Sequence, residues 1–281
     1  MAERLMNYIG GKLVAAATDD YLPVTNPATG ETIVKVPLGG GSELDMAVAA
    51  AATAQKSWGE TPVKDRVQVL FRMKQIVERK QSHLAEMIIR ENGKTLDEAI
   101  GSITRGVECI EYASSLPQIA TDRILTVGQG VECRTERYPL GVVAGITPFN
   151  FPFMVPLWML PLALGTGNAF ILKPSEQTPL GGMEIAEILQ EAGLPDGVFS
   201  VVHGGREMVE SICDHPGISA IGFVGSTKVA RAVRARGNAA GKRVRALGGA
   251  KNHLIVVPDA NPEMTATNVV ASVTGCAGQR C

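Results

Sequence analysis

The 281-residue sequence lacks the cysteine and histidine spacings that hold a metal or form a disulfide framework. Its five cysteines form no Cys-x-x-Cys pair and show no metal-ligand spacing with the four histidines. We therefore expect no metal site, free thiols, and a reducing compartment, which makes the cytoplasm the predicted location. The five cysteines are Cys109, Cys133, Cys213, Cys276 and Cys281.

We also expect no segment for export or for crossing a membrane. Residues Met1–Leu5 contain no apolar core of a signal peptide. The most apolar stretch, 151–164, is interrupted by Pro156 and Pro161 and is shorter than the roughly 20 residues of a membrane span. The formal net charge is -1 and both signs are mixed along the chain, so neither a nucleic acid nor an anionic membrane is the expected partner.

The composition is 45% hydrophobic and 20% charged, which is enough apolar material for a substantial core. From Gly141 onward, short apolar runs alternate with helical segments, among them 156–164, one from Pro179 to Ala192 capped by Thr178, and others from Arg206 and Thr227. This alternation predicts an α/β fold with a Rossmann-like parallel sheet, flanking helices, and ligands at the carboxyl ends of the strands. The runs predicted as strands are Val142–Ile146, Ala169–Leu172, Val198–Val202, Ile218–Val224 and Leu254–Val257.

The N-terminal half is predicted to begin with short strands near Tyr8–Lys12 and Thr32–Val34 and to continue with three helices. The first helix is capped by Ser42 and runs through Ala54, and the second spans about Val63 to Glu91. The third helix begins at the capping box Thr95-x-x-Glu98. Residues 124–142 alternate apolar and polar side chains with several turn formers, which predicts a protruding hairpin.

No Gly-x-Gly-x-x-Gly follows any predicted strand, so local pattern alone leaves the cofactor open. Five short segments, in this order and at these separations, nevertheless resemble the aldehyde dehydrogenase superfamily from Tyr8 to Cys281. Each of the five is weak alone, and their order along the chain carries the resemblance. The segments are 147–152 (TPFNFP), 173–179 (KPSEQTP), 223–227 (FVGST), 247–252 (LGGAKN) and 278–281 (GQRC).

The resemblance implies an NAD-binding domain formed by residues 1–123 and 143–253, with 124–142 as an oligomerisation hairpin. Residues 254–281 would then be the start of a truncated catalytic domain. Family members form dimers or tetramers through this hairpin and a C-terminal strand, so a homo-oligomer is expected for the full-length protein.

The family mechanism implies a thiolate that adds to an aldehyde, passes hydride to NAD, and becomes a thioester. By resemblance, Cys281 is this nucleophile and Asn150 is the amide that stabilises the developing alkoxide. Cys276 is the nearest rival thiol, but it lies outside the motif and suits a buried apolar position.

The resemblance also implies a set of cofactor contacts. Lys173 and Glu176 match the pair that holds the adenosine ribose, and a carboxylate there favours NAD over NADP because it would repel a 2′-phosphate. Ser226 begins a helix after a strand, and such a helix N-terminus can face the pyrophosphate. The remaining residues expected to line the cofactor are Thr147, Phe149, Gln177 and Gly248.

One departure from the family is informative. In hydrolytic members a glutamate precedes Leu-Gly-Gly and activates the deacylating water, but here Ala246 stands at that position. An extra Ala250 precedes Lys251, and this run resembles the methylmalonate-semialdehyde branch, which transfers the acyl group to coenzyme A. That branch converts methylmalonate or malonate semialdehyde to propanoyl-CoA or acetyl-CoA with loss of CO2, in either valine or inositol degradation.

A substrate carboxylate calls for an arginine that can bind it with two hydrogen bonds. Arg105 and Arg280 fit the resemblance, although Arg105 could equally be a solvated surface residue. Two alternatives to the acylating enzyme stay open: a hydrolytic semialdehyde dehydrogenase, and an NAD-binding fragment that ends at Cys281 and has little or no activity alone.

Overall fold

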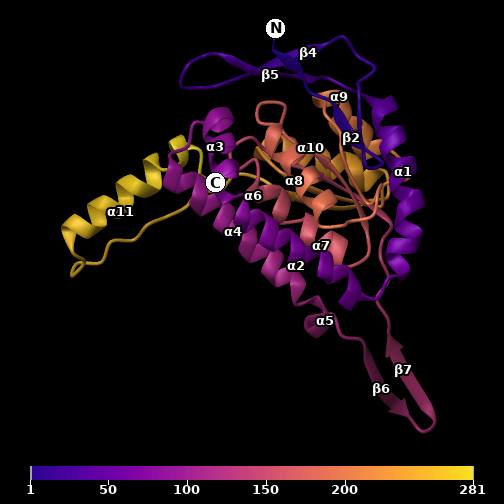
Figure 1. Cartoon of the computed structure of the whole chain (residues 1–281). Helices are drawn as coiled ribbons and strands as arrows, with labels where there is room; N and C mark the ends of the chain where they lie inside the picture. The colour runs from indigo at the N-terminus through magenta and orange to yellow at the C-terminus, as the bar shows by residue number, and fades with distance from the viewer. Residues whose placement is uncertain (1, 281) are drawn as a thin grey trace.

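A seven-stranded sheet forms the centre of the computed structural model, which describes residues 2–280 (Figure 1). The sheet order is β12-β11-β8-β9-β10-β2-β3, and the first five of these strands run parallel. Every residue of β8, β9 and β10 is buried, as expected for strands covered by helices on both faces. The predicted α/β fold is therefore confirmed. The strands are β2 (Asn7–Ile9), β3 (Lys12–Val14), β8 (Val142–Ile146), β9 (Ala169–Lys173), β10 (Phe199–Val201), β11 (Ala220–Val224) and β12 (Arg243–Leu247).

Helices cover both faces of this sheet and divide the apolar core into two clusters. One face carries α2 (Val63–Arg79), α3 (Gln81–Asn92), α4 (Leu96–Ser114), α7 (Leu160–Gly165) and α8 (Leu180–Glu191). The other face carries α1 (Gly41–Glu60), α9 (Arg206–Asp214) and α10 (Thr227–Ala239). The sheet thus lies between two packed helical layers, and the loops at the carboxyl ends of its parallel strands share one edge.

Smaller elements flank the two layers. The strands β1 (Glu3–Arg4), β5 (Thr32–Pro37) and β4 (Tyr21–Thr25) form a three-stranded sheet, and β6 (Arg123–Gly128) pairs with β7 (Val131–Thr135) in a hairpin that projects from the body (Figure 1). The helix α11 (Pro262–Thr274) extends away from the body and has no buried residue. The remaining elements are α5 (Leu116–Ile119), α6 (Met154–Leu157) and the 3₁₀ turn η1 (Cys276–Gly278).

Several helix boundaries differ from those predicted. The first helix begins one residue before Ser42, whose hydroxyl donates to Glu43 rather than capping, and Glu43 accepts from the Gly40 N–H instead. The predicted helix 63–91 is two helices that meet at Lys80, and 156–164 is divided between α6 and α7. Thr178 does not cap α8, because its hydroxyl donates 3.2 Å to the Phe149 carbonyl. Local patterns could not show these tertiary contacts.

The prediction for the C-terminal part of the sheet was wrong in two ways. Residues Leu254–Val257 form no strand and are exposed, because no described strand lies beside them to accept their hydrogen bonds. The edge strand β12, which was not predicted, pairs with β11 through residues Arg243–Leu247. Its charged residues alternate with Val244 and Ala246, a half-buried pattern that an edge position allows. No helix within residues 2–280 is long and apolar enough to span a membrane.

Candidate functional site

The loop after β8 carries three of the predicted site residues. Thr147 is buried, and its N–H donates 3.1 Å to the Lys173 carbonyl, so the β8–β9 pairing continues into the loop. Phe149 is 42% exposed, and its carbonyl accepts hydrogen bonds from Asn92 and Thr178. The Asn150 side-chain amide donates 2.7 Å to the Gln279 carbonyl. This bond brings Asn150 to the segment that leads directly to position 281.

The loop after β9 carries the predicted ribose-binding pair. The Lys173 ammonium is buried and lies 2.8 Å from the Glu176 carboxylate, which is about one-third exposed. Burial raises the pKa of Glu176, but the nearby Lys173 charge and its hydrogen bond outweigh this effect and leave the pKa below its usual value. Glu176 is therefore an ionised acceptor at neutral pH, and a ligand with hydroxyl groups can donate to it.

The loops after β11 and β12 bring Ser226 and Gly248 to the same end of the sheet. Ser226 caps α10, where its hydroxyl accepts from the Val229 N–H at 3.5 Å. Gly248 approaches the Thr227 backbone so closely that an added Cβ would lie 3.0 Å from the Thr227 Cα. The exposed N-terminus of α10, a position that favours anions, therefore lies beside the loop after β12.

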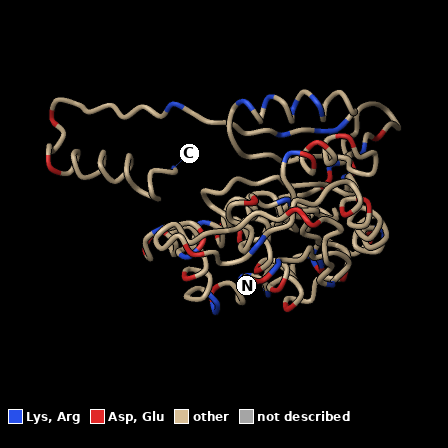
Figure 2. Tube along the Cα trace, turned by 90° about the horizontal axis from the view of Figure 1, so that it is seen from above, with Lys and Arg blue, Asp and Glu red and all other residues tan. Residues whose placement is uncertain are grey.

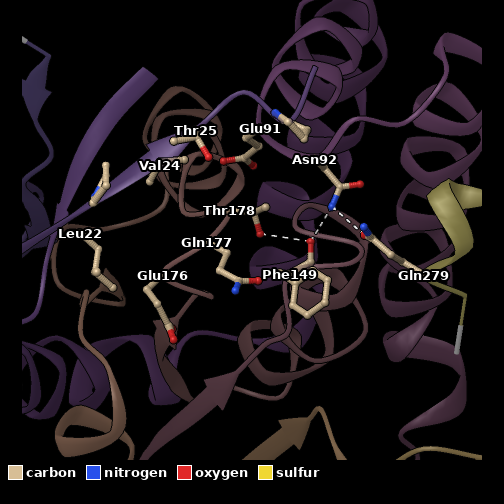
Figure 3. A pocket seen from close by; sticks show the side chains of 12 residues that line it. Leu22, Val24, Thr25, Glu91, Asn92, Phe149, Glu176, Gln177, Thr178 and Gln279 are labelled. Carbon is tan, nitrogen blue, oxygen red and sulfur yellow. Dashed lines mark hydrogen bonds between the residues drawn. The ribbon is translucent and has the colours of Figure 1, made fainter. Parts of the chain in front are cut away.

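A cavity of about 470 Å³ lies among β4, the end of α3 and the loops after β8 and β9 (Figure 3). Figure 3 shows Glu176 and Gln177 beside this space, with Phe149, Asn92 and Gln279 joined by hydrogen bonds along its other side. The structure thus brings Phe149, Glu176 and Gln177 around one cavity. Ser226 and Gly248 do not line it.

The two predicted substrate arginines lie at a second cavity, of about 690 Å³. Arg105 is on α4 and Arg280 follows η1, so tertiary structure brings together side chains that lie 175 positions apart. Arg105 is exposed and already bound to Glu108, with 2.8 Å between the guanidinium and one carboxylate oxygen. The lining also includes the apolar side chains of Phe151, Met154 and Trp158, the thiol of Cys276, and the carboxylates of Asp97 and Glu98.

The predicted nucleophile, Cys281, lies outside the described residues. Its rival Cys276 is buried, and its N–H donates to the Glu98 carboxylate. The hydrogen bond from Cys276 and, to a smaller extent, the one from the Thr95 N–H hold the pKa of Glu98 below its usual value. Partial burial acts in the opposite direction. Cys276 and Ala277 both have φ of 55°, a left-handed conformation that is strained for residues other than glycine. Within residues 2–280, no group of three or more metal-binding side chains gathers.

Sequence reasoning missed the turn Glu91-Asn92-Gly93-Lys94 between α3 and α4. Glu91 is fully buried and accepts hydrogen bonds from the first N–H groups of α8, at 3.0 Å from Leu180 and 3.4 Å from Gly181. Asn92 and Lys94 contact the loop that holds Asn150. A polar turn between two helices has no periodic signal, and these partners lie 56 or more positions away. The only local signal was Gly93, which ends α3 with φ of 80°.

The fold and these loops define a doubly wound α/β protein whose candidate ligand site lies at the carboxyl ends of its parallel strands. A family model narrows this class. It matches residues 13–281, and the chain belongs to the aldehyde dehydrogenase family. The resemblance carried by the five segments is thereby confirmed.

Similar proteins come from several bacteria. Malonate-semialdehyde dehydrogenase 2 of Geobacillus thermodenitrificans is 49% identical over 278 residues, which cover 99% of this chain and 58% of the relative. A solved methylmalonate-semialdehyde dehydrogenase from Oceanimonas doudoroffii is 42% identical, with a TM-score of 0.97 over 100% of this chain and 57% of that one. The chain therefore spans a little over half the length of these relatives.

Two further solved structures bear on the cofactor. One, from Sinorhizobium meliloti 1021, is described as a methylmalonate-semialdehyde dehydrogenase complexed with NAD, and is 42% identical with a TM-score of 0.98. The match covers 100% of this chain and 57% of the Sinorhizobium chain. Another, described as an NADP-dependent enzyme of E. coli, is 30% identical with a TM-score of 0.95 and covers 99% of this chain and 58% of its own. The shared fold thus accompanies either cofactor, and the choice depends on individual side chains.

Proposed function

We propose that the chain is the cofactor-binding part of an NAD-dependent, CoA-acylating dehydrogenase of malonate or methylmalonate semialdehyde. The single observation that carries the acylating mode is Ala246. It lies half-buried in β12 opposite Phe223, and its charged neighbours on the strand are the cations Arg243 and Arg245. A water molecule at this position would find no carboxylate on the strand to take its proton. A thiol such as coenzyme A needs less help, because part of it is already thiolate at neutral pH.

The residues present fit a dinucleotide with free ribose hydroxyls. The ionised Glu176 can accept from a ribose hydroxyl beside Lys173, and the N-terminus of α10 at Ser226 favours an anionic pyrophosphate. NAD, when bound, supplies the hydride acceptor of the oxidation. The residues proposed to hold it are Thr147, Phe149, Lys173, Glu176, Gln177, Ser226 and Gly248.

The proposed substrate is a short aldehyde that carries a carboxylate. Arg105 and Arg280 line one cavity and would bind this carboxylate. Cys281 is the proposed nucleophile, and its adduct would collapse to a thioester. Asn150, which donates to the carbonyl two positions before Cys281, is the proposed donor to the oxygen that becomes charged during the attack.

Omitting coenzyme A from the reaction tests this proposal. The full-length protein, given malonate semialdehyde and NAD alone, should release about one NADH per site and then stall as the Cys281 thioester. Addition of coenzyme A should restore steady turnover and yield an acyl-CoA, detectable by mass spectrometry. Rapid multiple turnover to the free acid without coenzyme A would contradict the acylating mode and favour a hydrolytic dehydrogenase.

A further inference from the structure

The turn between α3 and α4 buries a positively charged side chain next to the Asn150 loop. Lys94 is 2% exposed, and Gly93 before it adopts φ of 80° in a space where an added Cβ would lie 2.8 Å from Pro27. Any other residue at position 93 would strain the turn and clash with that proline. The chain therefore turns sharply inward here, and the Lys94 ammonium reaches the loop after β8.

Lys94 contacts the peptide of Asn150 itself. Its ammonium donates to the Asn150 carbonyl and, at 2.5 Å, to the side-chain oxygen of Asn92. It also lies 4.4 Å from the ring centre of Phe151, the next residue along the loop. A buried ammonium is stable only when acceptors and a polarisable surface replace its hydration, and these three contacts provide that replacement.

Asn92 contacts Phe149, the residue that precedes Asn150. Its amide donates 2.8 Å to the Phe149 carbonyl and 3.4 Å to the Gln279 side chain. Two consecutive carbonyls, those of residues 149 and 150, are thus held from one turn, as the upper right of Figure 3 shows for Phe149. Asn150 in turn donates to the Gln279 carbonyl, so the same network includes the segment before position 281.

We propose that Asn92 and Lys94 are positioning residues for Asn150. They fix the backbone on both sides of Asn150, so its amide keeps one direction relative to the segment before Cys281. An amide NH₂ has two N–H groups, and holding one on Gln279 fixes where the other points. Burial lowers the pKa of Lys94, although the nearby Cys276 and Glu98 groups raise it. This inference rests on the proposed function, in which Asn150 stabilises the developing oxyanion.

A double-mutant cycle on the full-length protein tests whether Lys94 acts through Asn150. Lys94→Met, which keeps the length of the side chain and removes its charge, should lower the rate constant of the NADH burst roughly 10- to 100-fold without changing the Kd for NAD. In an Asn150→Ala background the same change should cost less than about 3-fold, because the positioned group is gone. Lys94→Arg should restore part of the loss, and Lys56→Met, at an exposed lysine on α1, should have no effect.

A loss of equal size in both backgrounds would overturn the proposal, since Lys94 would then act independently of Asn150. An unchanged burst in Lys94→Met would overturn it as well. Should Lys94→Met fail to fold, Asn92→Ala takes its place in the same cycle, because it removes the bond to the neighbouring carbonyl and keeps the buried lysine.

A second measurement does not depend on catalysis. In the 281-residue chain labelled with ¹⁵N-asparagine, the side-chain signal of Asn150 is identified by its loss in Asn150→Ser. Lys94→Met or Asn92→Ala should shift or broaden this signal, and Lys56→Met should not. An unchanged Asn150 signal in both variants overturns the positioning role, even if the full-length protein oxidises no semialdehyde and the proposed function fails.

Discussion

At the residue scale, we expect the Glu176 carboxylate to decide which cofactor fits. Glu176 is ionised beside Lys173, and a 2′-phosphate would meet this carboxylate. The chain should therefore bind NAD more tightly than NADP. Glu176→Gln should reduce or reverse the preference by removing the repulsion. Fluorescence titration of both cofactors measures the two Kd values, and equal or tighter NADP binding by the unchanged chain would contradict the argument.

Position 246 offers the sharpest prediction at the residue scale. Ala246→Glu should raise the CoA-independent turnover of the full-length protein, because a carboxylate there could act as a general base. Such a base typically contributes a factor of roughly 10²–10⁴. Ala232→Glu, on the exposed surface of α10, is the matched control and should leave the rate unchanged. The same slow rate in Ala246→Glu would mean that the extra Ala250 has moved the backbone out of reach.

The two arginines of the second cavity make a prediction about specificity. Replacing Arg105 or Arg280 by leucine should mainly reduce kcat/KM for malonate semialdehyde. A lost charge-assisted contact costs roughly 1.5–3 kcal/mol, which is about one to two decades in kcat/KM. Propanal, which has no carboxylate, serves as the control substrate and should be little affected. Equal losses on both substrates would show that these arginines are structural.

At the scale of elements, Glu91 joins α3 to the first turn of α8 and should make stability depend on pH. The pKa of Glu91 is raised to about 8, mainly by burial and in smaller part by the nearby Glu184 charge. The hydrogen bonds from the Leu180 and Gly181 N–H groups lower this pKa, but they do not offset the burial. Between its ordinary pKa of 4.5 and 8, the unfolded chain loses this proton while the folded chain keeps it. Stability should therefore fall as pH rises, by roughly 3 kcal/mol between pH 5 and pH 8.

Urea unfolding of the chain and of Glu91→Gln at pH 5 and pH 8 measures this contribution. Glutamine stays neutral and can still accept from α8, so the variant should lose much less stability over the same range. Parallel pH dependences of the two proteins would show that Glu91 is ionised in the folded state.

The elements also show where local sequence suffices. The capping box at α4 was predicted from Thr95 and Glu98 alone, and both reciprocal bonds are present, at 3.3 Å and 3.2 Å. Caps of this kind depend on neighbours three positions apart. The break at Lys80 was not predictable, because the apolar pattern of α2 continues into α3 and both helices pack on the same core.

At the scale of the whole molecule, the β6–β7 hairpin presents several apolar side chains to solvent. Every residue of β6 and β7 is exposed, among them Leu125, which pairs with Cys133 across the hairpin. We expect this hairpin to contact a second copy of the full-length protein. Leu125→Lys should weaken self-association in sedimentation velocity, whereas Thr126→Lys, on the opposite side of the strand, should weaken it less. Identical sedimentation of Leu125→Lys and the unchanged protein would exclude this interface.

The sequence by itself determined the α/β class, the alternation of strands and helices from β8 to α10, and the family, because periodicity and short motifs are local properties. It also identified Arg105 and Arg280 as candidates, but only the tertiary structure placed them at one cavity. The contacts of Asn92 and Lys94 with the Asn150 loop, and of Glu91 with α8, depend on segments that fold together from distant positions. Edge strand β12 and the unpaired 254–257 segment were likewise decided by which strands found neighbours, since a strand exists only through its partner's hydrogen bonds.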